Sequence, residues 1–159
     1  MENKCILVLY SYHHKNTEKV AEVVAQVLDA KIKNPQEIQP EDLQEYDLIG
    51  FGSGIYGAKH HNLLLDLADT LPQNPKGKAF IFSTGALTGK KKLAKDHSLL
   101  REKLESKGYI IVDEFQCKGF NTNSFMKYFG GMNKKRPNEE DLKYAQDFAY
   151  NLKRNLQKK

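Results

Sequence analysis

The chain has 159 residues, of which 40% are hydrophobic and 28% charged, and its 25 Lys and Arg outnumber its 20 Asp and Glu to give a formal net charge of +5. This length predicts a single domain, residues 1–159, whose core needs neither disulfides nor metals. The two cysteines, Cys5 and Cys117, form no C-x-x-C pair, which argues against a metal cluster or a dithiol redox motif. No apolar run approaches the roughly 18 residues that span a bilayer, and no signal-peptide pattern precedes the first strand, so we expect a cytoplasmic protein.

Three basic runs, at residues 90–92, 134–136 and 158–159, contribute much of the excess positive charge. A run of like charge is most often a solvated surface, although a basic surface can also face an anionic partner. Neither an aromatic RNA-binding signature nor a DNA-reading helix accompanies these runs. We therefore expect no specific nucleic-acid partner.

A polar segment joins the first predicted strand to the first predicted helix. Residues 5–9 form a continuous apolar run, typical of a strand buried on both faces, and residues 17–28 repeat valines at helical spacing. At such a turn, backbone N–H groups and the positive end of the helix dipole stabilise an anion. The side chains of this turn supply hydrogen-bond donors and positive charge: Ser11, His13, His14, Lys15, Asn16 and Thr17.

The same residues also suit an ordinary connection in which Asn16 or Thr17 caps the helix. The turn contains neither G-x-x-x-x-G-K-[ST] nor G-x-G-x-x-G, so it supports neither a P-loop nucleotidase nor a dinucleotide-binding turn. If this turn binds a ligand, the ligand is expected to be a mononucleotide.

The rest of the chain continues the alternation of strands and helices. The predicted elements are a short strand at 30–32, a connector at 35–40, a strand at 48–53, a helix at 62–71, a strand at 79–83, a lysine-rich helix that ends at Gly108, a strand from Ile110 toward Cys117, and a last helix capped by Asn138. Most of the strands are apolar enough to be buried on both faces, which implies a parallel sheet covered by helices on either side. The fold class is therefore doubly wound α/β with a five-stranded parallel sheet.

Small and polar residues follow three of the predicted strands, at residues 11–17, 53–57 and 83–89. In a doubly wound fold, ligands bind beyond the carboxyl ends of the strands, near the point where the strand order reverses. The three segments are therefore expected to lie on one edge of the sheet and to form one site.

These segments resemble those of flavodoxins, and the resemblance covers essentially the whole chain. The motifs that carry the resemblance are Tyr-Ser-Tyr-His-His-Lys-Asn-Thr from Tyr10, Gly-Ser-Gly-Ile-Tyr-Gly from Gly52, and Ser-Thr-Gly-Ala from Ser83. The resemblance implies the strand order 2-1-3-4-5 and a noncovalent FMN that carries electrons between redox partner proteins. It also implies that the protein contributes no acid, base or nucleophile of its own, because the chemistry belongs to the cofactor.

The resemblance also assigns residues to parts of the flavin. The first segment corresponds to the phosphate loop, although His13, His14 and Lys15 stand where small residues are usual. In the second segment, Ile55 or Tyr56 would pack on the ring. Ser53, Gly54 and Gly57 would form the rest of this loop, and its two glycines can adopt positive φ. The third, Thr84, Gly85 and Ala86, would border the other side of the ring and lacks the tyrosine that many flavodoxins place there. Gly119 and Phe120, in a long polar and aromatic segment, are candidates to compensate for it.

Several alternatives stay open at this level. A response-regulator receiver shares the fold, but the acidic residues that it needs are replaced by Ser11 and Ser53. An FMN-dependent oxidoreductase of the quinone or protoporphyrinogen type, and a flavodoxin-shaped binding protein without flavin, are the remaining candidates. His60 and His61 are expected either to cap the second long helix or to line the mouth of the pocket. The positive net charge predicts a less negative flavin potential than that of acidic flavodoxins.

Overall fold

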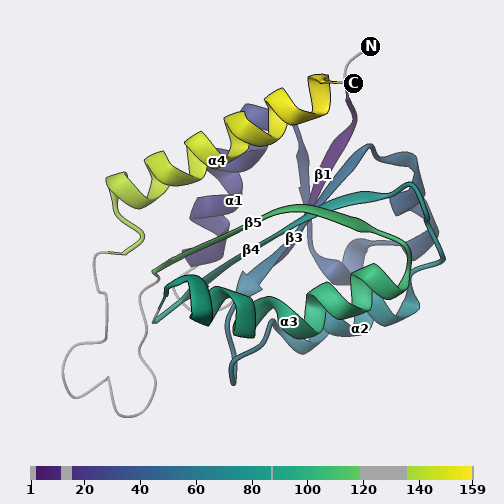
Figure 1. The fold of residues 1–159 in the computed structure, drawn as a ribbon, viewed down its shortest axis with the longest axis horizontal. Helices are drawn as coiled ribbons and strands as arrows, with labels where there is room; N and C mark the ends of the chain where they lie inside the picture. The colour runs from purple at the N-terminus through teal and green to yellow at the C-terminus, as the bar shows by residue number, and fades with distance from the viewer. Residues whose placement is uncertain (1–2, 12–15, 87, 119–135, 159) are drawn as a thin grey trace.

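The computed structural model describes residues 3–11, 16–86, 88–118 and 136–158, and it shows five parallel strands in one sheet (Figure 1). The strand order is β2-β1-β3-β4-β5, so the predicted doubly wound fold and its strand order are confirmed. The strands are β1 (Cys5–Tyr10), β2 (Lys31–Lys33), β3 (Leu48–Gly54), β4 (Lys78–Gly85) and β5 (Ile110–Lys118). The helices are α1 (Asn16–Leu28), α2 (Asn62–Thr70), α3 (Lys90–Ser106) and α4 (Glu139–Gln157).

Helices cover both faces of the sheet, with α1 and α4 on one face and α2 and α3 on the other (Figure 1). Successive residues of a strand point to opposite faces, so Leu7 and Leu9 of β1 pack toward α1 and α4, whereas Ile6 and Val8 pack toward α2 and α3. Because both faces are covered, β1, β3 and β4 are buried at almost every position.

Two glycines of β3 make room for aromatic side chains of the neighbouring strand. A Cβ atom on Gly50 would lie 2.3 Å from the ring of Phe80, and one on Gly52 would lie 2.2 Å from the ring of Phe82. Both rings are fully buried. Gly50 and Gly52 are therefore required by packing, since any side chain there would occupy the space of these two rings.

Some element boundaries differ from the sequence prediction. The connector after β2 contains two short 3-10 helices, Pro35–Glu37 and Pro40–Glu45, because prolines begin both turns and Asn34 caps the first. The edge strand β5 is less buried than the central strands, with Ile110 and Val112 exposed. The predicted cap of α4 is confirmed, since Asn138 forms a capping box with Asp141. In the described part of the chain, no helix has the length and apolar character to cross a membrane.

Candidate functional site

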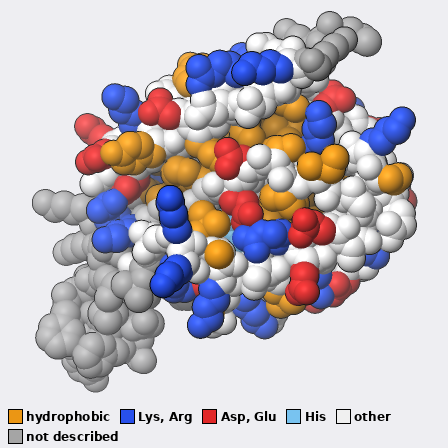
Figure 2. All heavy atoms as spheres, in the orientation of Figure 1, with side chains coloured by type: hydrophobic (Ala, Val, Ile, Leu, Met, Phe, Trp, Pro, Cys, Tyr) orange, Lys and Arg blue, Asp and Glu red, His pale blue; other side chains and the backbone are white. Residues whose placement is uncertain are grey.

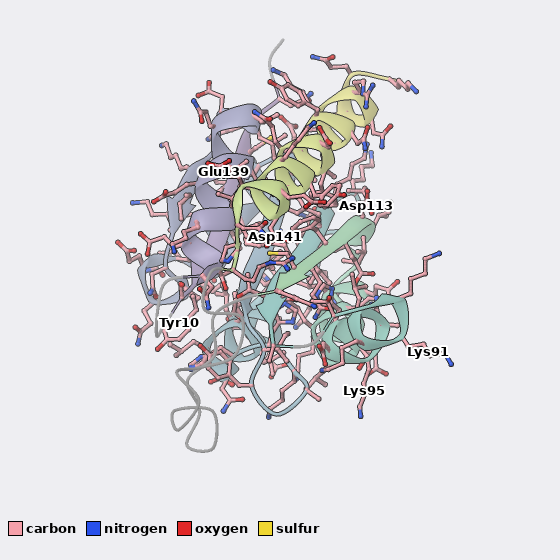
Figure 3. The ribbon with its side chains drawn as sticks, turned by 90° about the vertical axis from the view of Figure 1, so that its left-hand side faces the viewer. Tyr10, Lys91, Lys95, Asp113, Glu139 and Asp141 are labelled. Carbon is pink, nitrogen blue, oxygen red and sulfur yellow. The ribbon has the colours of Figure 1, made fainter. Side chains whose placement is uncertain are left out.

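The carboxyl ends of β1, β3 and β4 lie side by side. In the sheet Tyr10 pairs with Ser53, Ser53 pairs with Ser83, and Gly54 pairs with Thr84. The described parts of the three polar segments therefore share one edge, as the sequence predicts. Figure 3 faces this edge and labels Tyr10 at the end of β1.

The first segment meets the third through a buried hydrogen bond. Asn16 and Thr17 begin α1 and are buried, and the Thr17 and Thr84 hydroxyl oxygens lie 2.8 Å apart. At the end of β1, the Ser11 hydroxyl is also buried, and it has no hydrogen-bond partner among the described residues. An unsatisfied buried hydroxyl costs about 1–3 kcal/mol, so Ser11 is suited to an acceptor that binds at the start of α1. His13, His14 and Lys15 lie outside the described residues.

The second segment forms a tight turn between β3 and α2. The Ile55 N–H donates to the Thr84 carbonyl at 3.0 Å, and the Tyr56 N–H donates to the Lys59 carbonyl at 2.8 Å. Gly57 and Ala58 hold the turn with φ of 59° and 61°. The expected positive φ is therefore found at Gly57, whereas Gly54 keeps a strand conformation because it is the last residue of β3.

The two histidines before α2 have different environments. His61 caps α2, since its Nδ1 accepts from the Leu63 N–H at 3.1 Å, which confirms the capping role for this residue. Its ring stacks on Tyr10 with centroids 3.9 Å apart, and Tyr56 meets it edge-on at 5.1 Å. These three rings form an aromatic cluster between the first and second segments. Tyr10 was not among the residues predicted for the site, since it reads as the last residue of an apolar strand.

His60, by contrast, neither caps the helix nor lines a pocket mouth. It is 1% exposed, and its Nε2 donates to the Phe82 carbonyl at 3.0 Å, in the tautomer that leaves Nδ1 without a hydrogen. No described residue hydrogen-bonds to that Nδ1. Burial, together with the nearby His97 ring at 4.8 Å, lowers the pKa of His60 to about 3. The expectation for His60 was therefore wrong, because the turn places its ring in the interior, against β4 and the His97 ring of α3.

A network of hydrogen-bonded side chains from α3 and β5 contacts the third segment at Ser83. His97 of α3 is fully buried, with its Nε2 2.7 Å from the Ser83 hydroxyl and its Nδ1 2.9 Å from Glu114 of β5. Arg101 donates two hydrogen bonds to the same carboxylate, at 2.7 and 2.8 Å. Burial raises the pKa of Glu114, but the hydrogen bonds from His97 and Arg101 outweigh burial and hold that pKa at about 2. Glu114 is therefore ionised at neutral pH.

Gln116 closes this network on the side of α3. Its amide donates to Asp96 at 2.9 Å and to the Ser83 hydroxyl at 3.3 Å, and Asp96 is paired in turn with Lys92. The order Ser83, His97, Glu114 is that of a hydrolase triad, but Ser83 is fully buried and its hydroxyl is already in two hydrogen bonds. The network therefore positions the end of β4. Sequence reasoning missed it, although the spacing of Leu93, His97, Leu100 and Leu104 places this histidine on the apolar side of its helix.

The two cysteines are core residues, as the sequence predicts for Cys5. Both are free and buried. Burial raises the pKa of the Cys5 thiol to about 11 and that of the Cys117 thiol to about 12. Both thiols are therefore protonated at neutral pH.

A family model described as "Flavodoxin domain" matches residues 7–135, and the chain belongs to this family. It is 46% identical over 152 residues to "Uncharacterized protein MJ0298" of Methanocaldococcus jannaschii, a match that covers 96% of this chain and 99% of that protein. Among solved structures it is similar to a flavodoxin from the domain Archaea, with a TM-score of 0.70 and 17% identity over 97% of this chain and 99% of that one. It is also similar to oxidised flavodoxin 2 from Bacillus cereus, with a TM-score of 0.70 and 19% identity over 92% and 95% of the two chains. At these identities, the structural likeness shows the fold.

Proposed function

We propose that this protein binds FMN noncovalently at the carboxyl edge of its sheet and carries electrons between redox partner proteins in the cytoplasm. The observation that carries the proposal is the Ser11 hydroxyl, which is buried at the end of β1 without a hydrogen-bond partner among the described residues. Ser11 directly follows β1, and α1 begins at Asn16, five residues further along the chain; at a helix start, backbone N–H groups and the helix dipole favour a phosphate.

The residues of the three segments fit the parts of FMN. Ser11, Asn16 and Thr17 would hold the phosphate, together with His13, His14 and Lys15. Ile55 or Tyr56 would pack on the ring, with Ser53, Gly54 and Gly57 forming the turn below it. Thr84, Gly85 and Ala86 would border the opposite side. Gly119 and Phe120, which lie outside the described residues, complete the proposed set.

Three structural features support a pre-organised site of this kind. The hydrogen bond between Thr17 and Thr84 ties the proposed phosphate loop to the third segment. The Ile55 N–H bond to the Thr84 carbonyl ties the second segment to the third. Ser53 is fully buried, and its hydroxyl accepts from the His61 N–H at 3.1 Å. Segments held together in this way lose little conformational freedom on binding, which favours affinity.

When bound, FMN supplies the electron transfer, and the protein supplies binding, orientation and electrostatics. In the described residues, the thiols are protonated and the Ser83 hydroxyl is enclosed, so these groups are not available as nucleophiles. The net charge of +5 favours an added negative charge on a bound group. We therefore expect a flavin potential less negative than that of an acidic flavodoxin, which spectroelectrochemistry would measure.

The visible absorption spectrum of the purified protein, before and after addition of FMN and removal of the excess, tests this proposal. A bound-flavin spectrum is the expected result. A colourless protein that retains no FMN would overturn the proposal and favour a binding protein without flavin. If the flavin-loaded protein catalyses the reduction of a quinone or the oxidation of a porphyrinogen over many turnovers, it is an FMN-dependent oxidoreductase and the carrier role is wrong.

A further inference from the structure

The first turns of α3 carry four lysines next to the proposed flavin site. Residues 89–95 contain these lysines and no acidic residue. We name them the lysine patch: Lys90, Lys91, Lys92 and Lys95. The helix begins directly after the third segment, so the patch adjoins the edge at which the ring would lie. Figure 3 shows the labelled Lys91 and Lys95 side chains projecting outward from α3, and Figure 2 shows basic side chains gathered over the start of this helix.

Most of this positive charge is not balanced by an ion pair with the part of the chain that the structure describes. Lys92 is paired with the buried Asp96, but Lys90, Lys91 and Lys95 are exposed and take part in none of the ion pairs found among the described residues. Other lysines do find partners, as Lys103 does with Asp69 at 2.7 Å. The lysine patch therefore presents uncompensated positive charge to solvent beside the proposed site.

The patch also works against the stability of its own helix. Positive charge near a helix N-terminus opposes the helix dipole. Lys91 and Lys95 are four residues apart, where like charges repel on the helix surface. Gly89 offers no side-chain cap. The start of α4 has the opposite design, with three acidic residues in its first turn and a capping box. Lys90, Lys91 and Lys95, which form no ion pair among the described residues, therefore do not serve local helix stability.

We infer that the lysine patch is a docking surface for a redox protein whose own electron-transfer group is surrounded by acidic residues. The inference rests on the proposed electron-carrier function. Opposite charges would orient the partner so that its redox group faces the third segment, and long-range attraction would raise the rate of encounter. In the transfer itself, the reduced protein loses one electron and is oxidised, and the oxidised one gains that electron and is reduced.

The test compares two charge-reversal variants. K91E/K95E reverses two charges in the lysine patch, and K76E/K78E makes the same change in net charge at the amino end of β4, which is the opposite edge of the sheet. All four side chains are exposed, so both variants are expected to fold, which circular dichroism would check. The probe is an acidic [2Fe–2S] ferredoxin, and stopped-flow absorbance measures the electron transfer from the reduced ferredoxin to the FMN-loaded protein.

At low ionic strength, K91E/K95E is expected to lower the second-order rate constant by about tenfold, and K76E/K78E by less than about twofold. At about 0.5 M salt, the wild type and K91E/K95E should converge, because exposed charges are then screened over a few ångströms. Equal loss of rate in the two variants would show an effect of net charge alone, and no loss in either would show that the patch is not used. Either result overturns the proposal.

A binding measurement separates this proposal from the cofactor assignment. Isothermal titration calorimetry of the FMN-free protein with the same ferredoxin should give a Kd that rises about tenfold in K91E/K95E and is unchanged in K76E/K78E. If the protein retains no FMN, the carrier function fails, but a tenfold higher Kd in K91E/K95E still supports the docking surface. Equal Kd values in the wild type and K91E/K95E overturn the docking surface. If a 20-base-pair duplex DNA binds the wild type more tightly than ferredoxin does in the same buffer, and K91E/K95E abolishes that binding, the patch is a nucleic-acid surface and the proposal is wrong.

Discussion

The buried His60 should make the protein acid-labile in a way that one substitution removes. The ring is 1% exposed, and its Nε2 donates to the Phe82 carbonyl. Its pKa is about 3 in the folded protein, against 6.5 for an ordinary histidine. Between these two values the unfolded chain binds a proton that the folded protein excludes. Stability linked to His60 is therefore fully present above pH 6.5 and is lost as the pH falls toward 3.

The size of the effect follows from the pKa difference. Each pKa unit corresponds to about 1.4 kcal/mol, so lowering the pH from 7 to 4.5 should remove about 2.5 kcal/mol of the free energy of unfolding through His60 alone. Glu114, with a pKa lowered from 4.5 to about 2, contributes in the same direction but mainly below pH 4.5. Measurements above pH 4.5 therefore separate His60 from Glu114. Because burial also lowers the pKa of His61, the comparison with a His60 variant is what isolates the effect of His60.

The assay is urea denaturation of the wild type and of H60Q at several pH values between 4.5 and 7.5. Glutamine carries an amide N–H near the position of the histidine Nε2, and it does not titrate in this range. At pH 7, H60Q should be less stable by about 1–2 kcal/mol, because it packs less well in the space of the ring. At pH 4.5, the difference should have shifted by about 2.5 kcal/mol in favour of the variant.

H61N is the matched control. Asparagine is a good helix N-cap, and His61 is far less buried than His60, so H61N should show a much smaller shift with pH. If the stability difference between the wild type and H60Q stays constant within about 0.5 kcal/mol across this range, His60 is not held neutral by burial and the reasoning is refuted.

Three further substitutions test the packing and the site. T17V removes the hydrogen bond to Thr84 and should raise the Kd for FMN about tenfold, measured by quenching of FMN fluorescence; T17S keeps the hydroxyl and should bind nearly as the wild type does. G52A places a Cβ 2.2 Å from the Phe82 ring and should lower the free energy of unfolding by about 1–3 kcal/mol in urea; equal stability would contradict the close packing. N138A removes the cap of α4 and should cost about 1 kcal/mol, whereas N138D should cost little; a loss as large in N138D would rule out the capping role.

The strands, the helices and the common edge could be predicted from the sequence. Residues 5–9 are a continuous apolar run, and residues 48–53 combine large apolar side chains with glycines; both patterns are typical of a short strand covered on both faces. The valines of α1 recur at the spacing of one helix face, and Asn138 precedes three acidic residues at the start of α4. These signals are local, because each depends on residues within a few positions of one another. The shared edge then follows, since parallel strands end on the same side of a sheet.

The contacts that build the candidate site were decided by the tertiary structure. Thr17 and Thr84 are 67 residues apart, and Tyr10 ends β1 whereas His61 caps α2. No spacing rule in the sequence therefore predicts either of these two contacts. The network of Ser83, His97 and Glu114 depends on the register between β4 and β5 and on the rotation of α3 against them. A sequence shows which residues are polar and which helix face is apolar. Only the packing of helices on the sheet decides which of those polar groups are brought within hydrogen-bonding distance, because that distance is set by contacts between elements remote in the chain.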